Sequence, residues 1–189
     1  MIFQNTSLQG AYTIELEPFQ DQRGLFARTY CVDEFAEIGH QKPFVQFNHS
    51  HTNLKGALRG LHYQNPPHAE IKLIRCIKGG VYDVIVDIRR DSPTFLKHIG
   101  VELTEKNMRM IYVPEGFAHG FQTLENDTQL IYHHTASYKP SAEGGLRYDD
   151  PALNINWPLP ITELSKKDKI YMHLDTDFLG ITLNYRTRK

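Results

Sequence analysis

The stretch Gly79-Gly-Val-Tyr-Asp-Val-Ile-Val-Asp-Ile88 decides what kind of fold this chain adopts. Four apolar side chains recur at every second position and so share one face of a β-strand: Tyr82, Val84, Val86 and Ile88. Asp83 and Asp87 fall on the opposite face. The two glycines in front are typical of a turn that leads out of the preceding run, residues 70–77. The stretch therefore predicts a strand that starts directly after a turn.

Similar short runs follow one another along most of the chain, separated by turn residues. The ranges expected to form strands are 11–16, 25–30, 44–49, 57–63, 70–77, 98–103, 108–113, 118–124 and 128–135. Helical signals are few. Residues 33–38 before Gly39 favour a short helix, and Ser165 with Asp168 three residues later resembles the start of another. Many short strands with few, short peripheral helices predict an all-β sandwich or barrel.

The length of 189 residues fits one domain with its own core, so we expect a single domain over residues 1–189. The character of the chain changes in residues 151–160, which contain three prolines and the only tryptophan, Trp157. Proline-rich sequence of this kind is extended and irregular. From about residue 150 we therefore expect a C-terminal extension that wraps over the β-core.

Charge and composition exclude several partners. Lys and Arg number 21 against 22 Asp and Glu, which gives a net charge of −1 and predicts no binding to nucleic acid or to an anionic membrane. No apolar run approaches the roughly 20 residues of a membrane helix, and no secretory signal is visible. Two cysteines, Cys31 and Cys76, predict no disulfide framework and favour a cytoplasmic location. The ten histidines direct attention to acid–base or metal chemistry.

The segment 56–64 is the densest group of chemically able residues. Arg59 and His62 are three positions apart, so strict alternation would place them on opposite faces of a strand. Gly60 between them can accommodate a β-bulge, which would bring both to one side. The alternative is an exposed arginine beside a hydrogen-bonded core histidine.

Two further segments carry histidines in a strand pattern. Phe117, His119 and Phe121 alternate on one face, so His119 points either into a cavity lined by aromatic rings or into the core. In residues 128–135, Tyr132 shares its face with His134, although a strand tyrosine usually serves packing.

A metal site is not expected. Metal-binding cupins commonly carry a His-x-His pair, and here His62 is followed by Tyr63 and Gln64. His68, Glu70 and His119 could form another set of metal ligands, but Lys72 beside them would repel a cation.

Phosphate-binding glycine loops are also absent, so a pyrophosphate would have to be bound by cationic side chains. The candidates are Arg23, Arg59, Lys72 and Arg75.

Several motifs occur in a fixed order between about residues 10 and 170: Asp21-Gln-Arg-Gly24, Leu58-Arg-Gly-Leu-His-Tyr-Gln64, Val113-Pro-Glu-Gly-Phe-Ala-His-Gly-Phe121, Tyr138-Lys-Pro-Ser-Ala-Glu143 and Leu164-Ser-Lys-Lys-Asp168. Together they resemble the dTDP-4-dehydrorhamnose 3,5-epimerase family of nucleotide-sugar epimerases. The resemblance implies an isomerase with a cupin-like jelly-roll barrel, a homodimer that shares strands between subunits, and a nucleotide-diphosphate sugar as substrate. It also implies that neither a metal nor a redox cofactor is used.

By the same resemblance, His62 is the catalytic base that removes a proton next to the C4 carbonyl of a 4-keto-6-deoxyhexose. Asp168 supports its orientation and basicity, and Tyr132 is the acid on the opposite face of the sugar. Lys72, helped by His119, stabilises the enolate. The matching substrate-binding positions are Arg23, Gln46, Asn48, Arg59, His119, Glu143 and Lys167. The eight other histidines, including His68, His133 and His134, are expected to serve packing or to lie on the surface.

Four positions depart from the family pattern: Arg28, Phe47, Ser137 and His133, the last of which replaces a frequent lysine after Tyr132. The first two fall where the nucleotide end should bind, and the third leaves open whether C3, C5 or both are epimerised. The alternatives are therefore a single-site epimerase on another nucleotide sugar, such as a CDP-linked one, a metal-dependent cupin, or a non-catalytic binder of sugar nucleotides.

Overall fold

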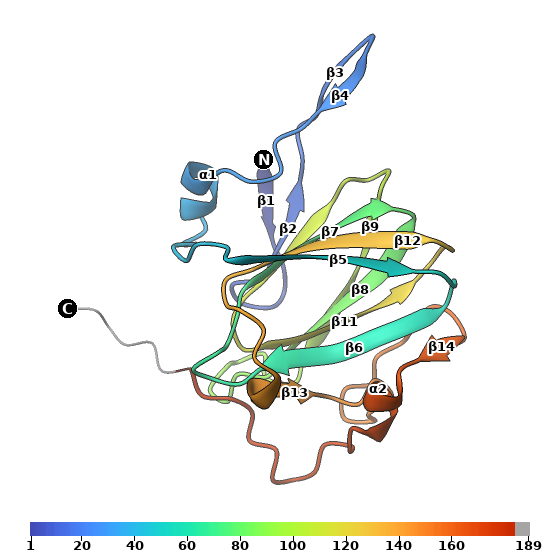
Figure 1. Ribbon diagram of the computed structural model, residues 1–189. Coiled ribbons are helices and arrows are strands. Elements are labelled where there is room, and N and C mark those ends of the chain that lie inside the picture. The colour runs from blue at the N-terminus through green and yellow to red at the C-terminus, as the bar shows by residue number, and fades with distance from the viewer. Residues whose placement is uncertain (184–189) are drawn as a thin grey trace, which may run out of the picture.

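Two antiparallel sheets face each other in the computed structural model, which describes residues 1–183 (Figure 1). The first sheet has the order β1 (Ile2–Asn5), β2 (Tyr12–Glu15), β10 (Met110–Val113), β7 (Lys72–Lys78), β12 (Thr128–His134) and β5 (Gln46–Thr52). The second has the order β13 (Glu143–Gly145), β6 (Ala57–Gln64), β11 (Phe117–Thr123), β8 (Gly80–Asp87) and β9 (His98–Thr104). The short strand β14 (Glu163–Leu164) runs parallel to β6. This arrangement is the cupin-like jelly roll that was expected.

The strand β8 is buried on both faces, and this decides where its two acids point. Val81 and Ile85 belong to the core between the sheets. Val84 and Val86 face outward, where Leu146, Leu153 and Ile181 of the C-terminal segment cover them. The acids of β8 have the same parity as Val81 and Ile85, so they turn into the barrel. The side chain of Asp83 therefore points into the interior of the barrel and not into solvent.

The glycine pair before β8 forms a turn, as expected, but it does not close a hairpin. β7 and β8 lie in different sheets, so the chain crosses from one sheet to the other there. Gly79 adopts a φ of +73°, and a Cβ at this position would come within 2.6 Å of Thr128 Oγ1. Both the backbone conformation and the close approach require glycine.

Both expected helices are present. α1 (Val32–Ala36) is shorter than predicted and buries Phe35 against the outer face of the first sheet, beside Ile14 and Leu73. α2 (Lys166–Ile170) begins at Ser165, whose hydroxyl accepts a hydrogen bond of 3.0 Å from the backbone N–H of Asp168. None of the helices in residues 1–183 is long and apolar enough to span a membrane.

The prediction of a strand over residues 25–30 is mostly wrong. β4 (Gly24–Phe26) ends early and pairs with β3 (Phe19–Asp21) in a hairpin that projects from the body of the molecule (Figure 1). Past Phe26 the chain turns towards α1, where the Tyr30 ring packs 4.8 Å from the Phe35 ring. The expected strand 44–49 is shifted to β5, and β1, β3, β13 and β14 were not predicted.

The chain after residue 150 is largely irregular and lies on the outer face of the second sheet. Leu153, Ile155 and Trp157 pack there, and the indole N–H of Trp157 donates a 3.0 Å hydrogen bond to the carbonyl of Tyr148. A short 3-10 helix, η1 (Pro140–Ala142), precedes this segment. The wrapping of this segment carries α2 to the side of β6, where the cavity opens.

Candidate active site

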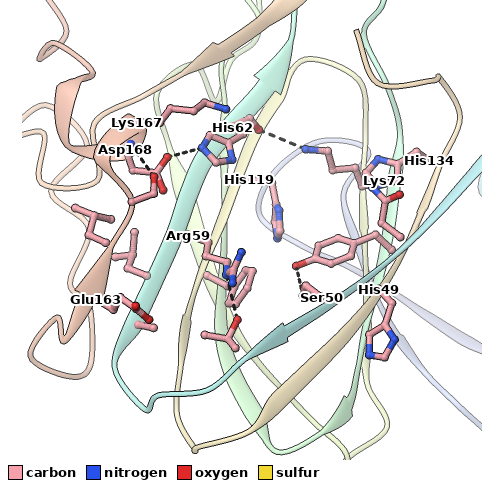
Figure 2. Close-up of a pocket in the computed structure, with 18 of the residues that line it drawn as sticks. His49, Ser50, Arg59, His62, Lys72, His119, His134, Glu163, Lys167 and Asp168 are labelled. Atoms are coloured by element: carbon pink, nitrogen blue, oxygen red, sulfur yellow. Dashed lines mark hydrogen bonds and ion pairs between the residues drawn. The ribbon is translucent and has the colours of Figure 1, made fainter. Parts of the chain in front are cut away.

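A cavity of about 890 Å³ opens between the two sheets. Its wall comes from β5, β6, β7, β11 and β12, together with the segment that leads into α2 (Figure 2). Most of the residues expected from the sequence to form the site lie in this wall: Asn48, Arg59, His62, Lys72, His119, Tyr132, Lys167 and Asp168. Residues that are far apart along the chain therefore meet in one polar space.

A β-bulge in β6 brings Arg59 and His62 to the same side. In the pairing of β6 with β11, His62 lies opposite His119 while Arg59 lies opposite Phe121, so β6 contains one extra residue. Gly60, with a φ of +115°, lies in the bulge, and a Cβ there would come within 2.5 Å of Gly120 Cα. The predicted bulge is confirmed, and glycine is required at its centre.

His62 lies next to a buried carboxylate. Its Nε2 is 2.6 Å from Oδ1 of Asp168, and the histidine side chain is 30% exposed while that of the aspartate is 3% exposed. Burial alone would raise the pKa of Asp168, but hydrogen bonds from His62, Ser165 and the Gly60 backbone hold it below its ordinary value. The carboxylate is therefore ionised and accepts a hydrogen bond from Nε2–H, so that in the neutral imidazole Nδ1 of His62 is the nitrogen that can accept a proton.

A second histidine–aspartate pair lies deeper in the wall. Nε2 of His119 is 2.8 Å from Oδ2 of Asp83, and both side chains are nearly inaccessible. Burial raises the pKa of Asp83 and lowers that of His119. Burial thus disfavours charge on both members of this pair.

Tyr132 faces the cavity from β12, in the sheet opposite His62. Its hydroxyl shares a 3.2 Å hydrogen bond with Ser50, and its ring lies edge-on to His119. Burial raises the pKa of the Tyr132 phenol, and the Ser50 hydrogen bond offsets only part of this rise. Tyr132 therefore holds its proton at any ordinary pH and is suited to donate it.

Lys72 enters the cavity from β7. Its ammonium group donates a 3.5 Å hydrogen bond to the carbonyl of His62 (Figure 2). The same ammonium group lies 3.4 Å from Oε1 of Glu70. Glu70 also accepts a 2.8 Å hydrogen bond from Nδ1 of His134. Lys72 is thus a paired cation next to the carbonyl of the residue expected to be the base.

The remaining expected residues lie at the rim or outside the cavity. Gln46 donates to Asn48 across 3.2 Å, and Glu143 is ion-paired with Lys167. Arg23 lies at the tip of the β3–β4 hairpin, where it is paired with its neighbour Asp21. In the single chain, Arg23 is therefore not brought to the cavity. Arg75 does not line the cavity either.

Of the four departures from the family pattern, only Phe47 lines the cavity. Its ring is 66% exposed and lies edge-on to the ring of His133 at 4.7 Å. Arg28 instead forms an ion pair with Glu34 of α1, and Ser137 is exposed.

The polar residues at or behind the wall that were not selected as site residues from the sequence include Ser50, Glu70, Asp83 and His134. Like His49, His134 was expected to serve packing or to lie on the surface, but its side chain lines the cavity. Its position could have been found, since it shares a strand face with Tyr132. Among residues 1–183, no three or more His, Cys, Asp or Glu side chains are grouped so as to hold a metal ion.

Comparison with known proteins agrees with this geometry. The family model described as dTDP-4-dehydrorhamnose 3,5-epimerase matches residues 5–176. A protein of that name from Salmonella typhimurium is 44% identical over 181 residues, which cover 95% of this chain and 98% of the relative.

Two crystal structures of such enzymes are also similar. One, from Bacillus anthracis with TDP and PPi bound, has a TM-score of 0.89 at 39% identity and covers 92% of this chain and 99% of its own. The other, from Legionella pneumophila in complex with dTDP-4-keto-L-rhamnose, has a TM-score of 0.89 at 37% identity and covers 96% and 98%.

The fold, the acid–base groups of the cavity and these matches define an isomerase of the nucleotide-sugar epimerase class. Within that class, the chain belongs to the dTDP-4-dehydrorhamnose 3,5-epimerase family.

Proposed function

We propose that this protein epimerises C3, C5 or both in a nucleotide-linked 4-keto-6-deoxyhexose, with the dTDP-linked sugar as the first candidate. The C4 carbonyl of such a sugar acidifies the hydrogens on both neighbouring carbons. Inversion at either carbon requires a base on one face of the ring, stabilisation of the enolate oxygen, and an acid on the other face. One observation carries the proposal: His62 and Tyr132 line the same cavity from opposite sheets.

His62 is the base in this proposal. Its Nδ1 accepts the proton from carbon, and the ionised Asp168 at Nε2 stabilises the resulting imidazolium. Tyr132 then delivers a proton to the opposite face of the same carbon, because its phenol remains protonated. Solvent returns both groups to their starting protonation states before the second carbon reacts.

Lys72 stabilises the enolate by placing an ammonium charge next to the carbonyl of His62. The N–H groups of His119 and Arg59, which share the wall with His62, supply further hydrogen-bond donors. Asn48 and Lys167 hold the nucleotide-diphosphate part at the mouth of the cavity. Gln46, which is hydrogen-bonded to Asn48, and Glu143, which is ion-paired with Lys167, contact the same part of the substrate at the rim.

A homodimer accounts for Arg23 and for the hairpin that carries it. Phe19, Leu25 and Phe26 expose large apolar surfaces on a hairpin that projects into solvent. Among residues 1–183 the first sheet ends at β5, and no described strand pairs with the outer edge of β5, which can therefore accept another strand. We infer that the hairpin of one subunit docks at this edge of its partner and brings Arg23 to the diphosphate in the partner's cavity.

The chemistry consists of proton transfers, so the proposal includes no metal and no redox cofactor. It also includes a cytoplasmic location, because both cysteines are free thiols and such thiols persist in a reducing compartment.

Deuterium incorporation tests the reaction. The wild-type protein, incubated in D₂O with the dTDP-linked 4-keto-6-deoxyglucose, should place deuterium at C3 and C5, measured by NMR. Deuterium at one carbon alone would support the single-site alternative. The base assignment of His62 is wrong if His62→Ala incorporates deuterium as fast as wild type.

Mixing two inactive variants tests the dimer. In a heterodimer of Arg23→Ala with His62→Ala, an arginine acting in trans leaves one cavity with both residues intact. Random pairing should then restore about a quarter of wild-type activity. If Arg23 acts in its own subunit, every cavity carries a defect and mixing restores nothing. A monomer in sedimentation at micromolar concentration would also overturn the proposal.

A further inference from the structure

The buried pair Glu70–His134 lies on the first sheet, next to Lys72 and Tyr132. Oε2 of Glu70 accepts a 2.8 Å hydrogen bond from Nδ1 of His134, and each side chain is 9% exposed. Oε1 of the same carboxylate lies 3.4 Å from Nζ of Lys72. Burial alone would raise the pKa of Glu70, but His134 and Lys72 lower it, so the group is an ionised carboxylate. None of the roles proposed above uses this pair.

Strand register explains why the three groups meet. His134 on β12 lies directly opposite Lys72 on β7. Glu70 precedes Lys72 by two positions, so its side chain lies on the same side of the extended chain. The register thus fixes His134 against Lys72, and Glu70 lies in the segment that leads into β7, one residue before Ile71, whose carbonyl accepts a 3.1 Å hydrogen bond from the backbone N–H of Thr135.

The hydrogen bonds of His134 fix its tautomer and link it to the rim of the cavity. Its Nε2 lies 3.3 Å from Nδ2 of Asn48, which can only donate. His134 therefore accepts at Nε2 and donates from Nδ1 to Glu70. Asn48 in turn accepts from Gln46. The result is one directed series of hydrogen bonds from the rim to the carboxylate that binds Lys72.

His134 also supports the residue proposed as the acid. Its ring stacks on that of Tyr132, with 6.0 Å between centroids and 20° between planes. A single side chain therefore contacts Tyr132, Asn48 and Glu70.

We propose that Glu70 and His134 are positioning residues for the reaction: Glu70 fixes the ammonium of Lys72 beside the enolate oxygen, and His134 fixes Glu70. This inference rests on the proposed role of Lys72. A lysine has a long flexible stem, and its charge helps only where the developing oxyanion forms. By holding one carboxylate oxygen, His134 keeps Glu70 from turning fully onto Lys72 and neutralising its field.

The main test compares kcat and KM in variants of nearly unchanged size. Glu70→Gln and His134→Leu should lower kcat about tenfold to thirtyfold and change KM by less than about threefold, because the positioning acts in the transition state. His134→Asn, whose amide can still donate to Glu70, should recover most of the loss. Equal effects of His134→Leu and His134→Asn, or a rise in KM with unchanged kcat, would overturn the proposal.

An exposed histidine–carboxylate pair away from the cavity provides a control. His51 on β5 lies 3.3 Å from Asp127, and both side chains are exposed and outside the cavity wall. His51→Leu and Asp127→Asn should leave kcat within about twofold of wild type. Thermal melts of all variants verify that they are folded. If Glu70→Gln does not fold, the comparison of His134→Leu with His134→Asn decides the matter.

Lys72→Met separates failure of this inference from failure of the proposed function. If Lys72→Met is as active as wild type, the proposed role of Lys72 is wrong. If Lys72→Met is impaired while Glu70→Gln is not, only the positioning inference is wrong. If both are impaired, adding Glu70→Gln to Lys72→Met should cause little further loss, since the carboxylate acts through the lysine. Independent, multiplying losses would overturn the inference.

Discussion

Two histidine–aspartate pairs lie at the same cavity, and their histidines differ in solvent access much more than the pairs differ in hydrogen-bond length. The His62–Asp168 distance is 2.6 Å and the His119–Asp83 distance is 2.8 Å. The side chain of His62 is 30% exposed, whereas that of His119 is 6% exposed. The first pair is closed by α2 from the C-terminal segment, and the second lies between adjacent strands β8 and β11.

The surroundings of the two carboxylates give them opposite pKa shifts. The pKa of Asp168 is lowered by its donors, and that of Asp83 is raised by burial. An ionised Asp168 favours protonation of its histidine and so suits a base. The deeper pair, in which charge is disfavoured on both members, suits a fixed hydrogen-bonding group. The hydrogen-bond donors around each carboxylate and the solvent access of each histidine thus suit the same two residue types to different tasks.

The largest expected effect comes from the accessible histidine. His62→Asn should lower kcat about a thousandfold, because asparagine cannot accept a proton from carbon. KM should change little, and NMR detection of deuterium incorporation should show no exchange at either carbon above background. If kcat falls less than about tenfold in His62→Asn, the distinction between His62 and His119 is wrong, because His62 then contributes no more than a hydrogen-bonding residue.

The next largest effect is the difference in kcat between variants of the two aspartates. Asp168→Asn should lower kcat about a hundredfold, since the neutral amide no longer stabilises an imidazolium at His62. Asp83→Asn should cost no more than about threefold, because a neutral amide resembles the uncharged state that burial already favours there. Steady-state rates of the two purified variants decide this. Similar losses in both would show that depth does not distinguish the pairs.

A smaller effect is expected for the deeper histidine. His119→Asn should lower kcat about tenfold, the usual scale for losing one hydrogen bond to a developing charge in part of the reaction. The pH profile of kcat/KM should keep its shape, because His119 transfers no proton. If the acidic side of this pH profile shifts in His119→Asn, then His119 takes part in proton transfer and the two histidines have more similar roles than proposed.

The smallest effect is on stability at acid pH. The folded-state pKa of Asp168 is lowered, so its contribution is complete above the ordinary aspartate pKa of about 4 and disappears as the pH falls through the folded value. Asp168→Asn should therefore lower the unfolding free energy by roughly 2 kcal/mol at pH 7 and by less near pH 3. Urea unfolding at both pH values measures this. An equal loss at both would contradict an ionised Asp168.

Much of the site could be predicted because its signals are local. The alternation around Val84 identified the strand, and Gly60 between Arg59 and His62 identified the bulge. The inward direction of Asp83 could not be predicted, because β8 is apolar on both faces and the sequence does not say which face the C-terminal segment covers. Nor could the contact of Glu70 with His134 be predicted, since it depends on the register between β7 and β12.

The origin of Asp168 has a consequence for how the protein responds to proteolysis. The aspartate that orients His62 is 106 positions further along the chain, on a helix of the terminal segment. In the proposed mechanism, a barrel in which this segment is detached keeps His62 but lacks the carboxylate next to it. Proteolytic cutting of the irregular chain ahead of α2 should therefore lower activity to the level of Asp168→Asn if the cut segment leaves β6.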